Sequence, residues 1–165
     1  MLAAACGRTD ETGAGDGGAL AVSSTALADG DEIPVEFTCD GDDVVPDLTW
    51  TDVPGDTVEM VIVVDDPDAP GGTFTHWTVW GLQPDAAPVD GDLPPGAVEG
   101  TNDFGQVGYR GPCPPVGDGP HRYRFRVLAL DSSLDLSRGA AAAQLSDAIS
   151  GHVVAWGQLQ ATYAR

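Results

Sequence analysis

The chain of 165 residues contains no lysine, and its seven arginines stand against 26 aspartates and glutamates, so that the formal net charge is −19. The electrostatic field of such a protein repels a phosphate backbone, and no nucleic-acid partner is therefore predicted. A salt-adapted origin accounts for the acidity as well as a function would.

Long apolar runs are also missing, because no stretch approaches the roughly 18 residues that a membrane-spanning helix needs. No transmembrane segment is predicted. Small residues at 3–5 followed by Cys6 and a Gly/Thr/Asp tether resemble the end of a lipoprotein signal, although its charged start is absent. Lipid anchoring at Cys6 and a chance match are the two interpretations. The predicted location is accordingly extracellular or membrane-anchored, and otherwise cytoplasmic.

The composition changes after the first residues of the chain. Residues 1–21 are polar and low in complexity, which predicts a disordered leader, and residues 22–165 have the length of one domain with a core. The 22 glycines and 13 prolines punctuate short segments and favour a mainly β fold.

Apolar alternation and β-branched runs predict six strands, and helix-forming residues near the carboxyl end predict one helix. The predicted strands are 32–39, 48–51, 58–64, 74–82, 121–130 and 158–163, and the helix is 138–150, with Gly151 as its stop. Residues 83–120 show little periodicity, which indicates either a functional connection or missed elements.

Two of these strands carry histidines. The alternation in 74–82 places His76 on the face of Trp80 and opposite Trp77. In 121–130, His121 and Tyr123 share one face, and three arginines occupy the other, more exposed-looking one.

Acidic residues follow the buried strand 58–64, at Asp65, Asp66 and Asp68. They are either turn formers, whose carboxylates accept nearby backbone N–H bonds, or functional acids. A carboxylate beside an imidazole stabilises the imidazolium, and His76 and His121 both lie near glycine- and proline-rich loops. Two such cations beside glycine-rich backbone N–H groups would form a small anion pocket.

Four short motifs in order resemble the phosphatidylethanolamine-binding proteins, also called Raf kinase inhibitor-like proteins. They are DPDAP at 66–70, THW at 75–77, GYRGPCPP at 108–115 and HRY at 121–123. The early loop FTCDGDDVVPDLTW at 37–50 is similar to that of the bacterial and archaeal branch.

The resemblance covers 26–165 and implies an antiparallel β-sandwich with a helix near the carboxyl end. It also implies a pocket for phosphate, phosphorylated head groups or acetate, and a kinase, protease or lipid as the regulated partner. The residues carried over to this pocket are Asp66, Asp68, Pro70, His76, Gly111, Cys113, Pro114, His121 and Tyr123. Asp65 is left out as a turn or surface acid.

The resemblance also places Cys39 and Cys113 in loops beside the pocket. An oxidising location would favour a disulfide between them, and two free buried thiols are the alternative.

No complete catalytic set is visible, because the chain has neither a Gly-x-Ser-x-Gly elbow nor a phosphate-cradling Gly-Lys-Ser loop. A binding and regulatory module without a cofactor is the leading prediction. A hydrolase that uses Asp66 with His76 or His121 as an acid/base pair on phosphoesters or acyl esters is the alternative. A copper or zinc site of His76, Cys113 and His121 has unsuitable spacing, and no metal site is predicted.

Overall fold

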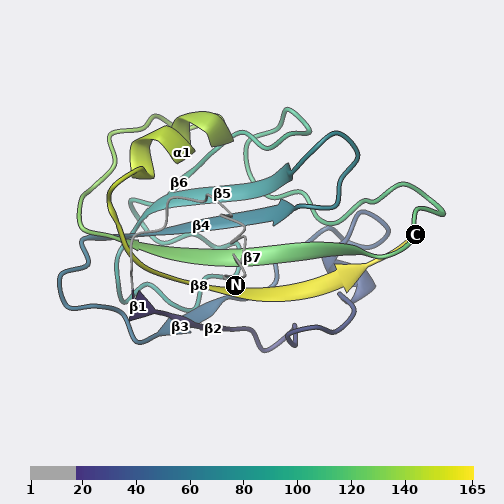
Figure 1. Ribbon diagram of the computed structural model, residues 1–165, viewed down its shortest axis with the longest axis horizontal. Helices are drawn as coiled ribbons and strands as arrows, with labels where there is room; N and C mark the ends of the chain where they lie inside the picture. Colours follow the sequence, from purple (N-terminus) through teal and green to yellow (C-terminus); the bar gives the residue numbers. More distant parts are fainter. Residues whose placement is uncertain (1–17) are drawn as a thin grey trace, which may run out of the picture.

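The computed structural model describes residues 18–165, which form two β-sheets and one α-helix (Figure 1). The strands are β1 (Gly18–Ala19), β2 (Ala21–Ser23), β3 (Thr49–Thr51), β4 (Glu59–Asp66), β5 (Phe74–Leu82), β6 (Val98–Glu99), β7 (His121–Leu130) and β8 (Val153–Tyr163). The helices are the 3-10 turn η1 (Val35–Phe37) and α1 (Ala142–Ile149). The larger sheet has the order β1-β8-β7-β4-β5-β6 and the smaller one pairs β2 with β3. All pairings are antiparallel except that of β1 with β8, which confirms the predicted mainly β fold with a helix near the carboxyl end.

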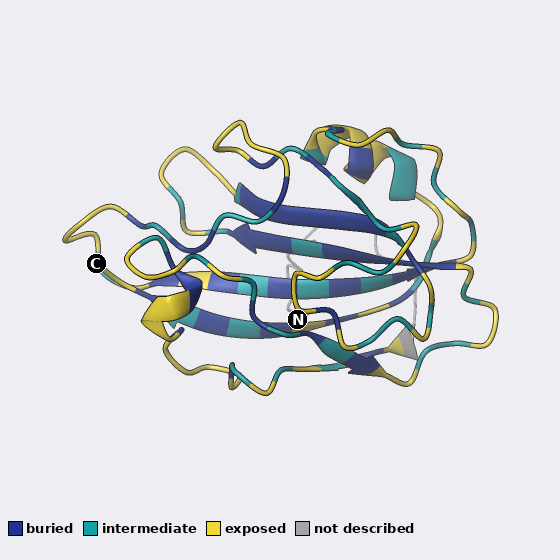
Figure 2. Cartoon of the chain, turned by 180° about the vertical axis from the view of Figure 1, so that it is seen from behind, coloured by how far each residue is buried: buried dark blue, intermediate teal, exposed yellow. Residues whose placement is uncertain are grey.

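The centre of the larger sheet is buried on both faces (Figure 2). One face of β4, β5, β7 and β8 packs toward the smaller sheet in a core that includes Ile62, Val127 and Trp50. The other face packs against α1, where Leu145 meets Trp80 in a second cluster. Burial on both faces explains why β4 lacks alternation and is rich in β-branched residues. Strands β5 and β7 have the predicted bounds.

The folded domain begins earlier than the predicted boundary at residue 22. Gly18 and Ala19 pair with Ala155 and Trp156 of β8, and the Leu20 N–H donates to the Trp156 carbonyl at 3.0 Å. Residues 18–21 therefore belong to the fold rather than to the leader. The predicted anchoring site at Cys6 lies outside the described residues, and within residues 18–165 no helix is long and apolar enough to cross a membrane.

The strand predicted at 32–39 is wrong. Its centre is η1, in which the Phe37 and Thr38 N–H groups donate to the carbonyls of Pro34 and Val35. Pro34 has no N–H for a ladder and its fixed φ suits the start of such a turn. The alternation reflects a loop that buries Ile33 and exposes Val35, with relative exposures of 1% and 55%.

The long segment 83–120 contains elements that its sequence did not reveal. It holds β6 and isolated bridges such as Leu48 with Val89 and Thr101 with Val107. The helix α1 is shorter at its start than predicted, while Gly151 adopts φ +80° just beyond it, as the predicted stop requires. Strand β8 begins five residues before the predicted 158, at Val153.

Candidate functional site

A β-bulge decides where His76 points. Strand β5 pairs Trp77 with Val64 but Thr75 with Asp65, so that the register shifts by one residue at His76. A bulge of this kind redirects a side chain out of strict alternation. His76 consequently lies beside Tyr123, with ring centroids 5.3 Å apart, while Trp80 packs under α1 on the other face. The predicted common face for His76 and Trp80 is wrong for this reason.

A pocket of about 250 Å³ opens where the bulge meets the ends of β4 and β7. It is lined by Asp66, Ala69, Pro70, Phe74, His76, Phe104, Cys113, Pro114, Pro115, His121 and Tyr123. The structure thus brings together all the residues predicted for the site except Asp68 and Gly111.

His121 is held between two carboxylates. Its Nδ1 lies 2.7 Å from Asp66 Oδ2 and its Nε2 lies 3.3 Å from Asp118 Oδ2. Burial alone would lower the pKa of His121, but the hydrogen bonds and charges of Asp66 and Asp118 raise it above its ordinary value. The Asp68 N–H donates to the other oxygen of Asp66 at 2.8 Å, which fixes this carboxylate. Protonated His121 therefore forms an ion pair with Asp66 at the pocket wall, and the raised pKa favours this state.

His76 is held in one tautomer by the backbone. Its Nδ1 lies 2.7 Å from the Arg110 carbonyl oxygen. Since a carbonyl can only accept, Nδ1 carries the hydrogen, and Nε2 is left for the pocket. Burial lowers the pKa of His76, although the bond to Arg110 and the charge of Asp66 oppose the shift. The neutral ring therefore presents an unprotonated Nε2.

Tyr123 carries a buried hydroxyl at the pocket wall. The residue is 0% exposed, and its hydroxyl has no hydrogen-bond partner in the part of the chain that the structure describes. Burial and the Asp66 carboxylate raise the pKa of Tyr123; this carboxylate and the backbone of Cys113 both face the hydroxyl, although neither makes a hydrogen bond of good geometry with it. The phenol therefore stays protonated and can donate into the pocket.

Two phenylalanines form an aromatic rim that sequence reasoning did not assign. Phe74 and Phe104 meet edge to face at 4.7 Å between centroids, and Phe104 lies 5.4 Å from the His76 ring. The Arg110 guanidinium lies 5.4 Å from the centre of the Phe104 ring. Phe104 sits in a turn that Asn102 organises by accepting its N–H at 3.0 Å. The Asn-Asp-Phe-Gly sequence is a turn signal, yet nothing local indicates that the turn reaches the pocket.

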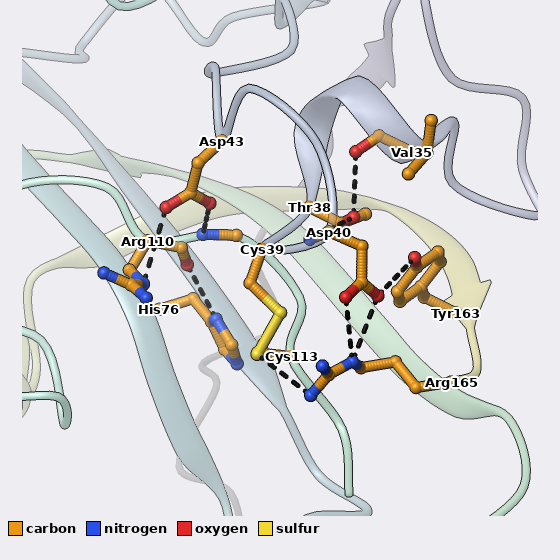
Figure 3. The surroundings of a disulfide bond; sticks show 11 residues. Val35, Thr38, Cys39, Asp40, Asp43, His76, Arg110, Cys113, Tyr163 and Arg165 are labelled. Atoms are coloured by element: carbon orange, nitrogen blue, oxygen red, sulfur yellow. Dashed lines mark hydrogen bonds and ion pairs between the residues drawn. A yellow bond between two sulfur atoms is a disulfide. The ribbon is translucent and has the colours of Figure 1, made fainter. Parts of the chain in front are cut away.

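A disulfide joins the pocket wall to the loop after η1. The sulfurs of Cys39 and Cys113 are 2.06 Å apart, across 74 residues of chain. Figure 3 shows this bond between the pair of Arg110 with Asp43 and the pair of Arg165 with Asp40. The disulfide interpretation is confirmed. The free-thiol alternative and a metal site with Cys113 as thiolate ligand are wrong, because the sulfur is already bonded.

Gly111 lies behind the pocket wall rather than on its rim. Its N–H donates to Asp43 Oδ1 at 2.7 Å, and a Cβ at this position would come within 2.3 Å of the Phe37 carbonyl oxygen. Close backbone approach, rather than ligand contact, therefore explains this glycine.

Asp68 and Asp65 both differ from their predicted roles because each meets an arginine of β7. Asp68 turns out of the pocket to Arg122, whose hydrogen bonds lower the pKa of Asp68 to about 2. Asp65 is no surface acid: it is 2% exposed and lies between Arg124 and Arg126. Among residues 18–165, no group of three or more histidine, cysteine, aspartate or glutamate side chains is arranged to hold a metal ion.

Comparisons with known proteins agree with this fold. A family model described as phosphatidylethanolamine-binding protein matches residues 23–164. A UPF0098 protein of Pyrococcus abyssi is 42% identical over 159 residues, which cover 92% of this chain and 89% of that protein. The crystal structure of Escherichia coli YbcL, described as a new member of the mammalian PEBP family, aligns with a TM-score of 0.84 and 33% identity over 88% of this chain and 98% of that one. Mycobacterium tuberculosis LppC, named as a candidate lipoprotein, is 45% identical over 132 residues, or 79% of this chain and 65% of that protein.

Proposed function

Since the chain belongs to the phosphatidylethanolamine-binding protein family, we propose that its pocket binds a small anion, such as phosphate or a phosphorylated head group. The observation that carries the proposal is the Tyr123 hydroxyl, a buried donor without a partner among the described residues. A buried polar group left unpaired costs free energy, and a ligand oxygen that accepts its hydrogen removes that cost.

A second donor can form opposite Tyr123. When an anion enters, its charge favours protonation of His76 Nε2, because Nδ1 already donates to Arg110. The centroids of the His76 and Tyr123 rings are 5.3 Å apart, so both side chains are close enough to contact the same anionic group. The backbone of Cys113 lies at the same place, beside the Tyr123 hydroxyl. Anion binding is thus coupled to uptake of a proton.

The ion pair at the wall makes anion binding compatible with the acidity of the chain. When His121 is protonated, its imidazolium neutralises Asp66 at 2.7 Å, so that this carboxylate does not stand alone against an entering anion. Charges elsewhere on the surface are screened beyond about 8 Å in physiological salt. Short hydrogen bonds inside the pocket therefore decide the affinity.

The proposal is binding rather than catalysis. Among the described residues the pocket wall contains no serine, threonine or lysine, and the sulfur of Cys113 is in a disulfide, so the hydroxyl, amine and thiol nucleophiles that these four residue types supply are absent from it. The hydrolase alternative is tested by incubating the protein and its His76→Ala variant with a panel of phosphoesters and aryl esters. Hydrolysis that depends on His76 would refute binding alone, and equal background rates would support it.

Occupancy of the pocket is proposed to regulate a partner, of which a kinase, a protease or a lipid is the predicted class. The disulfide supports an oxidising location, and the lipoprotein designation of the mycobacterial relative supports anchoring at Cys6. Mass spectrometry of the protein from its native source tests the anchor, and an unmodified Cys6 would contradict it.

The anion site is tested by NMR titration with inorganic phosphate and phosphoethanolamine at constant ionic strength. We expect ligand-dependent shifts at His76, His121 and Tyr123. His152 serves as the control, because its ring pairs with Asp131 on the surface and lies outside the pocket. Shifts at His152 alone, or at none of the histidines, would overturn the proposal.

A further inference from the structure

Cys113 has two roles in the structure, as a wall of the pocket and as one half of the disulfide to Cys39. We propose that this disulfide is a reversible thiol–disulfide site whose reduction weakens anion binding. The inference rests on the proposed anion-binding function and adds the oxidation state of the protein as its regulator.

The disulfide is the covalent link of the wall residues at 113–115 to the rest of the domain, and the next backbone anchor downstream is the Gly117 N–H, which donates to the Arg165 carbonyl at 2.9 Å. Upstream of Cys113 the loop has other anchors, since the Cys39 N–H donates to the Pro112 carbonyl at 3.1 Å and the Gly111 N–H donates to Asp43. Pro114 and Pro115 lack N–H groups and cannot donate backbone bonds. Reduction therefore loosens the short stretch between the anchors at Pro112 and Gly117, which forms this part of the wall.

This segment also shapes the donor group of the pocket. The backbone of Cys113 faces the Tyr123 hydroxyl, and Pro114 and Pro115 form the adjoining surface. A donor that must be ordered at the moment of binding contributes less than one already in place. The reduced protein should consequently bind anions more weakly without losing its fold, because β4, β5, β7 and β8 make no use of the bond.

The two cysteines lie close to the surface of the domain. Cys39 and Cys113 are both only half-buried, and the guanidinium of the exposed residue Arg165 reaches within 3.6 Å of Cys113 Sγ. In the reaction, a thiolate of an external dithiol attacks one sulfur, and the other leaves as a thiolate that takes a proton from water. The second thiolate of the dithiol then attacks the dithiol sulfur of the mixed disulfide, and the remaining cysteine leaves as a thiolate that takes a proton. The dithiol is thereby oxidised to a disulfide and the two cysteines are reduced.

The test is calorimetric titration of the full chain with phosphoethanolamine before and after reduction. Dithiothreitol is the suitable reductant, because it is uncharged and does not compete for an anion pocket. A thiol count establishes the state of the cysteines, and amide NMR spectra establish that the fold persists. We expect the dissociation constant to rise by about tenfold on reduction, which corresponds to the loss of one preorganised donor.

Two variants separate the disulfide from other contacts of the same loop. Cys39→Ser should bind as weakly as the reduced protein and should not respond to dithiothreitol. Asp40→Asn removes the charge that pairs with Arg165 and weakens the contact to Tyr163 while keeping the disulfide, and it should retain the response.

The outcomes distinguish this inference from the proposed function. Equal affinity of the oxidised protein, the reduced protein and Cys39→Ser would overturn the redox inference and leave the anion site intact. Absence of binding by the oxidised protein would overturn both. Collapse of the amide spectrum on reduction would assign the bond to global stability and would also overturn the redox inference.

Discussion

Replacing Tyr123 by phenylalanine should change stability and binding in opposite directions. The substitution removes one hydroxyl from a side chain that is 0% exposed and keeps the ring that packs against His76. In the free protein that hydroxyl is buried without a partner among residues 18–165. Burial of an unsatisfied polar group costs about 1–3 kcal/mol. We therefore expect Tyr123→Phe to increase the free energy of unfolding by about 1 kcal/mol.

Anion binding should weaken in the same variant. A hydrogen bond to a charged group contributes about 1.5–3 kcal/mol, which corresponds to a factor of roughly 10 to 150 in the dissociation constant. Because the pocket keeps its shape, the loss measures the hydroxyl itself. Urea unfolding at constant slope gives the stability change, and calorimetric titration with phosphoethanolamine gives the affinity change.

Tyr109 provides the matched control, since its buried hydroxyl donates to the Phe37 carbonyl at 2.8 Å and lies outside the pocket lining. Tyr109→Phe should lower the free energy of unfolding by about 1–3 kcal/mol, because it leaves a carbonyl unpaired. The reasoning is refuted if Tyr123→Phe destabilises the protein like Tyr109→Phe, or if it binds the ligand as tightly as the unsubstituted chain.

Three further predictions concern charge. Affinity for acetate should fall by up to tenfold per pH unit between the pKa of His76 in the free protein, which is lowered, and its higher pKa in the complex. Binding titrations from pH 5.5 to 8 should show this slope, and His76→Gln should lack it. The pKa of His121 is raised in the folded state, so its contribution to stability is fully present below its ordinary value of 6.5 and is lost as pH rises through the folded value; urea unfolding across this range should show the difference between His121→Gln and the unsubstituted chain shrinking toward alkaline pH. Asp65→Asn should lower the free energy of unfolding by about 3 kcal/mol in urea, because it leaves Arg124 and Arg126 without their shared buried carboxylate, and an unchanged midpoint would contradict this account.

The sequence predicts the long strands well because their side chains repeat with the period of the backbone. Strand β7 alternates between arginines and apolar or aromatic residues from Arg122 to Val127, and the apolar run continues to Leu130. A register shift leaves no such pattern, so the direction of His76 follows only from the pairing of Val64 with Trp77. The alternation at 32–39 is misleading for the related reason that a loop with one bridge to β8 and a tight turn can bury Ile33 and Phe37 without forming a strand.

The candidate site likewise contains residues that the sequence predicts and residues that it does not. Asp66, His121 and Tyr123 lie at strand ends that the motifs identify, and the structure brings them together. The role of Asp65 requires knowing that it lies opposite Arg124 in the sheet, which is a matter of register between strands far apart in the chain. Phe104 reaches the pocket from a turn whose place depends on contacts across the domain.

The outer edge of β8 has a consequence for behaviour in concentrated solution. A long strand at the border of a sheet presents free N–H and C=O groups on which another chain can add its own strand. Here Leu20 bonds to Trp156, Gly30 bonds to the Gln160 carbonyl, and Ile33 bonds to the Thr162 carbonyl. The segment around residues 18–33 thus occupies the template along the length of β8 and protects the protein against edge-to-edge aggregation.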